Sequence, residues 1–155
     1  MVANAGDCAG RLVRFKNGVV ASSEPLNARH TCFNLEEAAR VRRAGGRIVA
    51  GRVNGVLEPT RAVGDIDMKT DSMGAVIIAD PEVRHFRLDV GEPWTIVLGT
   101  DGLFDAMTDE AILSHVEGPL TAHQSAVDLA ERLCFVAAMK GDDDVTVVVA
   151  GALQR

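Results

Sequence analysis

This 155-residue chain has few of the features that mark membrane, secreted or nucleic-acid-binding proteins. No apolar run approaches the roughly 18 residues that a membrane-spanning helix needs. No basic segment precedes an apolar one at the N-terminus, so no secretory signal is visible. Positive charge is also scarce, because 16 Lys and Arg stand against 22 Asp and Glu and the formal net charge is −6. This balance argues against binding to nucleic acid or to an anionic membrane.

Cysteine is sparse as well, with Cys8, Cys32 and Cys134 as the three examples. They are far apart, odd in number and form no Cys-x-x-Cys pair, so the pattern indicates neither a disulfide framework nor a zinc site. We therefore expect reduced thiols in an intracellular protein of the cytoplasm or nucleus.

The composition is that of a folded domain, since 47% of the residues are hydrophobic and 25% are charged. The length predicts one domain over residues 1–155, and the mixture of patterns predicts an α+β fold. Helices are expected after Asn34, Thr108 and Thr121, and the strands are expected at residues 2–5, 11–15, 19–21, 76–79, 83–88, 94–98 and 145–150. The chain opens in mid-strand, so we expect it to be the back part of a larger domain.

Several local contacts can be predicted from the same patterns. Asn34 with Glu37, and Thr121 with Gln124, have the spacing of capping boxes at helix N-termini. Residues 47–71 are interrupted by glycines and are expected to be irregular. Arg61 is expected to pair within its own loop, with Asp65 as the nearby carboxylate.

Acidic residues stand at three predicted strand ends. Asp101 follows the apolar run 94–98, Asp143 lies in Gly-Asp-Asp-Asp before the last strand, and Asp7 follows the first strand. Asp and Gly are also the residues that turns prefer, so each junction alone is explained by turn chemistry. Three carboxylates at strand ends of one short domain, with few basic residues near them in the sequence, favour a shared site for a hard cation such as Mg²⁺ or Mn²⁺.

Sequence motifs along nearly the whole chain identify a family resemblance. They are residues 1–7 (MVANAGD), 51–57 (GRVNGVL), 60–65 (TRAVGD), 79–83 (ADPEV), 100–105 (TDGLFD) and 143–147 (DDVTV). In this order they resemble the segments ANxGDSR, GRVNGxLxxSRAxGD, AxPEV, SDGLWD and DNxTV of the metal-dependent protein serine/threonine phosphatases, the PP2C or PPM family. The resemblance is closest to eukaryotic-type members.

The resemblance implies a sandwich of antiparallel sheets flanked by helices, with two Mg²⁺ or Mn²⁺ ions between the sheets. Asp101 and Asp143 would be carboxylate ligands, and Asp7 would help to hold a weaker third ion. Gly102 would keep the backbone close to the site, and Asp144 replaces the family's Asn beside it. The implied reaction is attack of a metal-activated water on phosphoserine or phosphothreonine. No catalytic residue beyond the metal ligands is implied.

One departure bears on activity. The family's front portion carries DGHGG, whose Asp bridges both metals, and no Asp-Gly-His occurs in these 155 residues. We therefore expect weak metal binding and little activity from this chain alone. The expected partners are phosphoprotein substrates, with no nucleic acid and no membrane, and we expect a monomer. The alternative function is a non-catalytic pseudophosphatase or regulatory module that binds phosphoproteins or regulatory partners without turnover.

Overall fold

The computed structural model describes residues 1–69, 75–89, 91–117 and 125–152. Its contacts divide the chain into two compact units, each built from two stretches of sequence. The loop-rich unit consists of Met1–Asp7 and Asn27–His85, and the sheet unit consists of Cys8–Leu26 and Phe86–Arg155. Among the described residues, no helix is both long and apolar enough to cross a bilayer.

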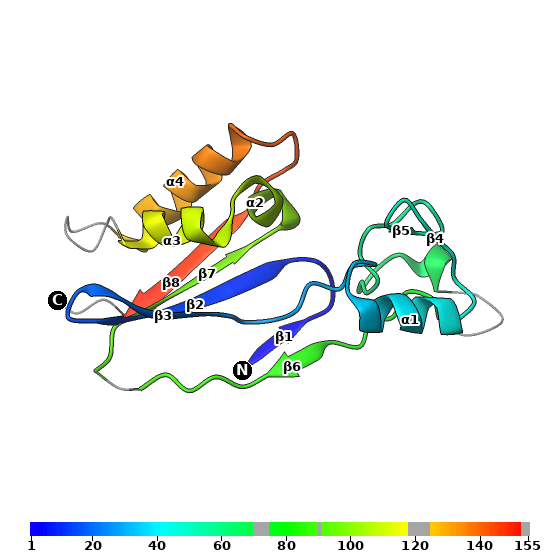
Figure 1. Cartoon of the computed structure of the whole chain (residues 1–155), viewed down its shortest axis with the longest axis horizontal. Helices are drawn as coiled ribbons and strands as arrows, with labels where there is room; N and C mark the ends of the chain where they lie inside the picture. Colours follow the sequence, from blue (N-terminus) through cyan, green and yellow to red (C-terminus); the bar gives the residue numbers. More distant parts are fainter. Residues whose placement is uncertain (70–74, 90, 118–124, 153–155) are drawn as a thin grey trace. The chain divides into compact units, whose positions relative to one another are not determined.

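The sheet unit is built on four antiparallel strands in the order β3-β2-β7-β8 (Figure 1). Their bounds are Val19–Pro25 for β3, Ala9–Lys16 for β2, Trp94–Gly99 for β7 and Val147–Ala152 for β8. Strands β2 and β3 form a hairpin whose turn residues, Asn17 and Gly18, both have positive φ. That conformation is the one that tight hairpin turns require. Strand β7 then joins this local hairpin to β8, which lies much later in the chain.

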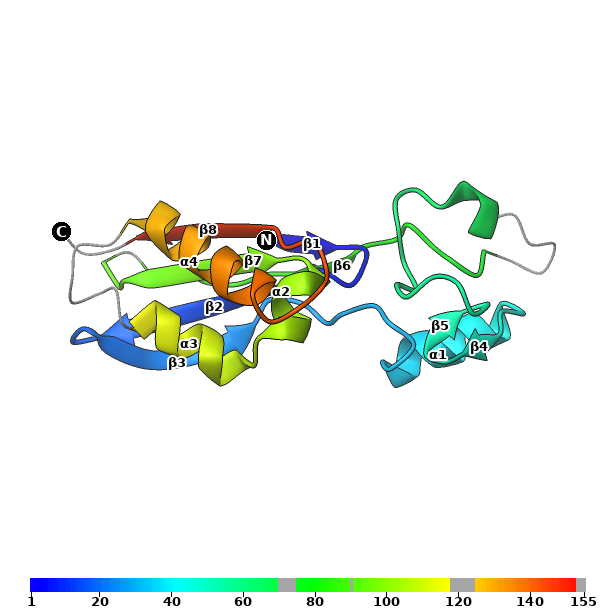
Figure 2. The ribbon, with the colours of Figure 1, turned by 90° about the horizontal axis from the view of Figure 1, so that it is seen from above.

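Helices cover one face of this sheet, as Figure 2 shows from above. They are α2 (Asp101–Ala106), α3 (Asp109–Glu117) and α4 (Ala126–Ala138). The core between them combines buried side chains of the sheet and of the helices, among them Val13, Phe15, Val97, Leu103, Ile112 and Leu133. Burying such apolar side chains is the main driving force for the packing of these two layers.

The N-terminus of α4 differs from the prediction. Thr121 and Gln124 lie outside the described residues, and the N-cap is Ser125. The Ser125 hydroxyl accepts a hydrogen bond from the Asp128 amide at 3.2 Å, and the Asp128 carboxylate accepts one from the Ser125 amide at 2.9 Å. This is a complete capping box, with Asp in the place usually taken by Glu or Gln.

The loop-rich unit has little regular structure. Strand β1 (Val2–Asn4) pairs antiparallel with β6 (Glu82–Arg84), and helix α1 (Leu35–Arg43) is followed by a hairpin of β4 (Ile48–Val49) and β5 (Arg52–Val53). A 3-10 turn spans Ile66–Met68. Its small core consists of Cys32, Val41, Val53, Val76 and Ile77.

Some predicted strands of this unit are wrong. Val76 and Ile77 are fully buried, but the segment forms an isolated bridge between Ile78 and Arg61 and no named strand. A short apolar run can fill a core without joining a ladder, so its apolar pattern indicates burial and not strand pairing. The strand expected at 83–88 is limited to β6, and the segment 47–71, expected to be irregular, contains the β4–β5 hairpin.

Candidate metal site

Two of the predicted acidic strand ends are brought to the same edge of the sheet unit. Strand β8 is the antiparallel neighbour of β7, with Gly99 opposite Val147. The end of β7 and the start of β8 therefore lie side by side. Beyond the ladder, the Thr100 amide donates to the Thr146 carbonyl at 3.1 Å, and the Thr146 amide donates to the Thr100 hydroxyl at 3.1 Å. These bonds hold the segment before Asp101 against the segment after Asp143.

The structure shows how each carboxylate is oriented. Asp101 is the first residue of α2, a helix that the sequence analysis missed, and its Oδ1 accepts a hydrogen bond from the Gly102 amide at 3.0 Å. Asp143 Oδ1 accepts one from the Asp144 amide at 2.8 Å. Within the described residues, no Lys or Arg forms an ion pair with Asp101 or Asp143. Two oriented carboxylates without a basic partner are chemically suited to a hard divalent cation.

Gly102 is required by the packing at this edge. A Cβ atom at residue 102 would lie 2.6 Å from the Asp144 carbonyl oxygen and 3.1 Å from its carbonyl carbon. The Thr100 hydroxyl donates to the same Asp144 carbonyl oxygen at 3.2 Å. The start of α2 thus lies directly against the backbone of the Asp144 loop, and a side chain at residue 102 would separate them.

Asp7 belongs to the loop-rich unit, where it follows Gly6 at the end of the first strand region. Its carbonyl oxygen accepts a hydrogen bond from Arg29 Nε at 2.9 Å. In the part of the chain that the structure describes, no three His, Cys, Asp or Glu side chains gather into a group that could hold a metal ion. The joint site of Asp7 with Asp101 and Asp143 stays a prediction.

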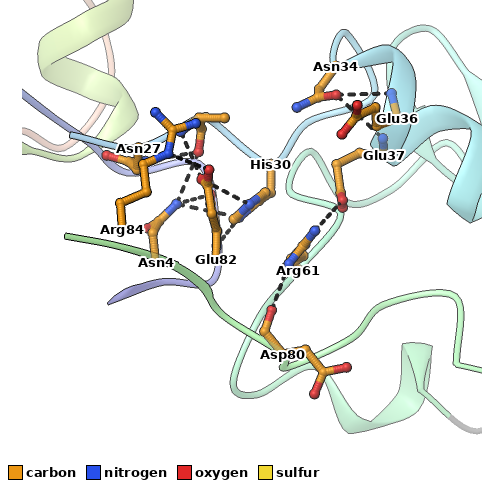
Figure 3. Close-up of polar contacts among 12 residues, drawn as sticks. Asn4, Asn27, His30, Asn34, Glu36, Glu37, Arg61, Asp80, Glu82 and Arg84 are labelled. Atoms are coloured by element: carbon orange, nitrogen blue, oxygen red, sulfur yellow. Dashed lines mark hydrogen bonds and ion pairs between the residues drawn. The ribbon is translucent and has the colours of Figure 1, made fainter. Parts of the chain in front are cut away.

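The segment before Asp7 is held by a buried histidine. His30, which Figure 3 shows beside Glu82, is 2% exposed, and its Nδ1 accepts a hydrogen bond from the Gly6 amide at 3.2 Å. The ring proton is therefore on Nε2, which faces Glu82 Oε2 at 3.8 Å. Burial, and then the positive charge of Arg61, lower the pKa of His30. A neutral imidazole thus fixes the Gly6 backbone, which Asp7 directly follows.

The loop-rich unit also contains a buried ionic network that the sequence analysis did not find. Glu37 is 3% exposed and accepts hydrogen bonds from Arg61 Nη2 at 2.6 Å, from the Thr60 hydroxyl at 2.7 Å and from Arg40 Nη2 at 3.0 Å. Arg61 reaches in the other direction to the Asp80 carbonyl at 2.9 Å (Figure 3). Glu37 therefore joins α1 to the segment that carries Thr60 and Arg61.

Two predictions about these residues are wrong. Asn34 caps α1 as expected, with its Oδ1 accepting from the Glu36 amide at 3.0 Å, but the Glu37 side chain is engaged with Arg61 and does not complete a capping box. Arg61 pairs with Glu37 on α1, not within its own loop. The sequence does indicate that Glu37 is buried, because Glu37 precedes Val41 by four residues and so lies on the apolar face of the helix. A carboxylate on that face needs buried partners.

The network predicts acid sensitivity of the fold. Burial raises the pKa of Glu37, but hydrogen bonds from Arg61, Thr60 and Arg40 outweigh it and lower the pKa to about 2, against 4.5 for the ordinary group. The stabilisation is thus present above pH 4.5 and is lost as the pH falls towards 2. The pKa shift of Glu37 corresponds to about 3 kcal/mol in the free energy of unfolding. Urea unfolding of wild type and of Glu37→Gln, measured at a series of pH values from 6 towards 2, checks this prediction. An equal dependence of the unfolding free energy on pH in the two proteins would contradict it.

The comparisons with known proteins agree with the motifs. The family model for protein phosphatase 2C matches residues 1–146. The chain belongs to the protein phosphatase 2C family. It is 37% identical over 151 residues to "Probable protein phosphatase 2C 47" of Oryza sativa subsp. japonica, covering 96% of this chain and 37% of that protein. It is 32% identical to "Protein phosphatase 2C homolog 3" of Schizosaccharomyces pombe, covering 99% of this chain and 38% of that protein.

The fold comparison gives the same result. The crystal structure of a phosphatase from Toxoplasma gondii superposes with a TM-score of 0.79 at 25% identity, and the match covers 98% of this chain and 47% of that one. The predicted α+β fold of PP2C type is therefore confirmed. The chain spans less than half the length of these relatives.

Proposed function

We propose that this chain supplies part of the active site of a metal-dependent protein serine/threonine phosphatase. The observation that carries the proposal is the pairing of β7 with β8, which brings Asp101 and Asp143 to the same edge of the sheet. Family membership supports the reaction class, dephosphorylation of proteins. The motif resemblance implies phosphoserine and phosphothreonine as the groups that are hydrolysed.

The residues of this edge fit a site for Mg²⁺ or Mn²⁺. Asp101 and Asp143 would bind the ions through carboxylate oxygens, and Asp7 would contribute to a weaker third position. Bound divalent ions would supply a water of lowered pKa and would offset negative charge on the phosphate. The protein's own part is to hold the two carboxylates at fixed positions, through the Thr100–Thr146 hydrogen bonds and the close approach at Gly102.

We expect the 155-residue chain on its own to bind Mn²⁺ weakly and to hydrolyse p-nitrophenyl phosphate little above background. The physical reason is that two carboxylates offset too little of the repulsion between two divalent ions, since no Asp-Gly-His segment supplies a bridging ligand here. Calorimetric titration with Mn²⁺ should show residual binding that Asp101→Asn or Asp143→Asn weakens by about tenfold or more. Asp89→Asn is the matched control, because Asp89 is paired with Arg87 elsewhere in the sheet unit.

The two parts of this proposal fail in different ways. Equal Mn²⁺ affinity in wild type, Asp101→Asn and Asp89→Asn would overturn the metal site. Robust turnover that Asp101→Ala abolishes would support the phosphatase site but contradict the expected inactivity of the chain alone. Binding of a phosphopeptide without turnover, in the presence of Mn²⁺, would favour the alternative of a non-catalytic binding module.

A further inference from the structure

The loop-rich unit carries a strongly basic stretch in a chain that is acidic as a whole. Residues 40–52 contain five arginines and no Asp or Glu, whereas the formal net charge of the chain is −6. Arg40 points inward, because its guanidinium donates to Glu37, to the Val76 carbonyl and to the Thr60 carbonyl. The other four are exposed to solvent: Arg42, Arg43, Arg47 and Arg52.

These four arginines lie close together in the fold. Arg42 and Arg43 form the last turn of α1, and the chain returns after Gly45 and Gly46 into the β4–β5 hairpin, which lies alongside α1 in Figures 1 and 2. Arg47 follows Arg43 by only four positions in the sequence, so their Cα atoms are at most about 14 Å apart. The helix end and the hairpin therefore present these exposed arginines within one short region of the loop-rich unit.

The hairpin places its arginines on the outer face. Val49 pairs with Arg52, and the Arg47 backbone is bonded to Asn54, so side chains at 47, 49 and 52 share one face while Ile48 and Val53 point inward. Arg52 is partly neutralised by Glu58 at 2.9 Å. The charge of the remaining arginines leaves the surface positive.

Exposed apolar groups adjoin these charges. Val49 is 54% exposed on the same outer face. Phe33 is 79% exposed, and its ring lies against Gly51 at the turn of the hairpin, where a Cβ atom would be 3.0 Å from the ring. We call the surface formed by Phe33, Arg42, Arg43, Arg47, Val49 and Arg52 the arginine surface.

Local stability does not account for this arrangement. Cations in the last turn of a helix interact favourably with its dipole, which explains Arg42 and Arg43. Arg52 is held by Glu58 and by the Val56 carbonyl, whereas Arg47 lies beyond the helix end, where that effect has fallen away. Exposed like charges near one another repel, and they are usually accompanied by acidic neighbours. A positive surface with apolar side chains beside it is complementary to an acidic peptide that carries an apolar residue.

We propose that the arginine surface is a docking site for an acidic segment of a partner protein, with Phe33 and Val49 contacting an apolar side chain of that segment. Nucleic acid is disfavoured as the ligand, because the rest of the chain is acidic and would repel a polyphosphate backbone. The proposal concerns binding alone and does not depend on metal binding or on turnover.

Fluorescence anisotropy of the full chain with a labelled glutamate-rich peptide containing one leucine tests this inference. We expect salt-sensitive binding that the double variant Arg42→Glu/Arg47→Glu weakens by about tenfold or more, with Arg42→Gln/Arg47→Gln intermediate. Arg87→Glu is the matched control, because Arg87 is 89% exposed and lies in the sheet unit. Phe33→Ala should weaken the leucine peptide but not one in which leucine is replaced by serine.

Several results would overturn the proposal. One is equal affinity of the Arg42→Glu/Arg47→Glu and Arg87→Glu variants, with circular dichroism showing both folded. Another is tighter binding of a single-stranded oligonucleotide or of anionic phosphatidylserine vesicles than of the peptide. If Arg42→Glu/Arg47→Glu does not fold, Arg42→Gln/Arg47→Gln provides the test. Unchanged peptide affinity of that variant would also overturn the proposal.

Discussion

Replacing Glu37 by leucine should lower the free energy of unfolding by about 3–5 kcal/mol, as expected when one member of a buried ionic network is removed. The carboxylate accepts from Arg61 at 2.6 Å, from Thr60 at 2.7 Å and from Arg40 at 3.0 Å, and all three donors would lose their acceptor together. Thr60 is fully buried, so water cannot easily replace the carboxylate as its hydrogen-bond acceptor. Chemical denaturation of the purified chain measures the effect.

Glu36→Leu is the control for this experiment. Glu36 is the neighbouring carboxylate in the same first turn of α1, but it is exposed. Its replacement should cost less than about 1 kcal/mol, the value of an acidic residue near a helix N-terminus. The double variant Glu37→Leu/Arg61→Leu should lose less stability than the two single variants added together, because the pair is coupled. A loss for Glu37→Leu no larger than that for Glu36→Leu would contradict the network's importance.

Replacing Gly102 by alanine should also destabilise the protein, although helix propensity alone predicts the opposite sign. Alanine is favoured over glycine within a helix by up to about 1 kcal/mol. The added Cβ atom would lie 2.6 Å from the Asp144 carbonyl oxygen, which is backbone and cannot rotate away. Forcing an atom into such a packed place typically costs about 1–3 kcal/mol, so the clash outweighs the propensity.

The same substitution should weaken Mn²⁺ binding by about tenfold or more, because it moves the Asp144 loop, and Asp143 with it, away from Asp101. Gly64→Ala is the control, since a Cβ atom there meets nothing within 4 Å and the residue does not have a positive φ. Thermal unfolding and Mn²⁺ titration of both variants check these expectations. Unfolding and titration curves for Gly102→Ala that match those of Gly64→Ala would show that the close approach is not required.

Local structure follows the sequence patterns at most of these positions. Asn17-Gly18 forms a tight turn between the strands expected at 11–15 and 19–21, Asn34 caps α1, and the apolar run at 94–98 is strand β7. Such features depend on a few neighbouring residues, whose backbone preferences act within one turn or one hairpin. The errors concern segments such as 76–79, where the apolar pattern shows that residues are buried but not what they pair with.

The order of residues along the chain was enough to establish the family, the α+β class and the acidic strand ends, because motifs, turns and caps are local properties. Only the tertiary structure decided which strand ends meet and which side chains donate to the Glu37 carboxylate. It also gives the reason why residue 102 must be glycine. The segments that carry Asp101 and Asp143 meet only because β8 pairs with β7, and Glu37 meets Arg61 across 24 positions of sequence. Contacts of this kind follow from the packing of whole elements, which no short stretch of sequence specifies.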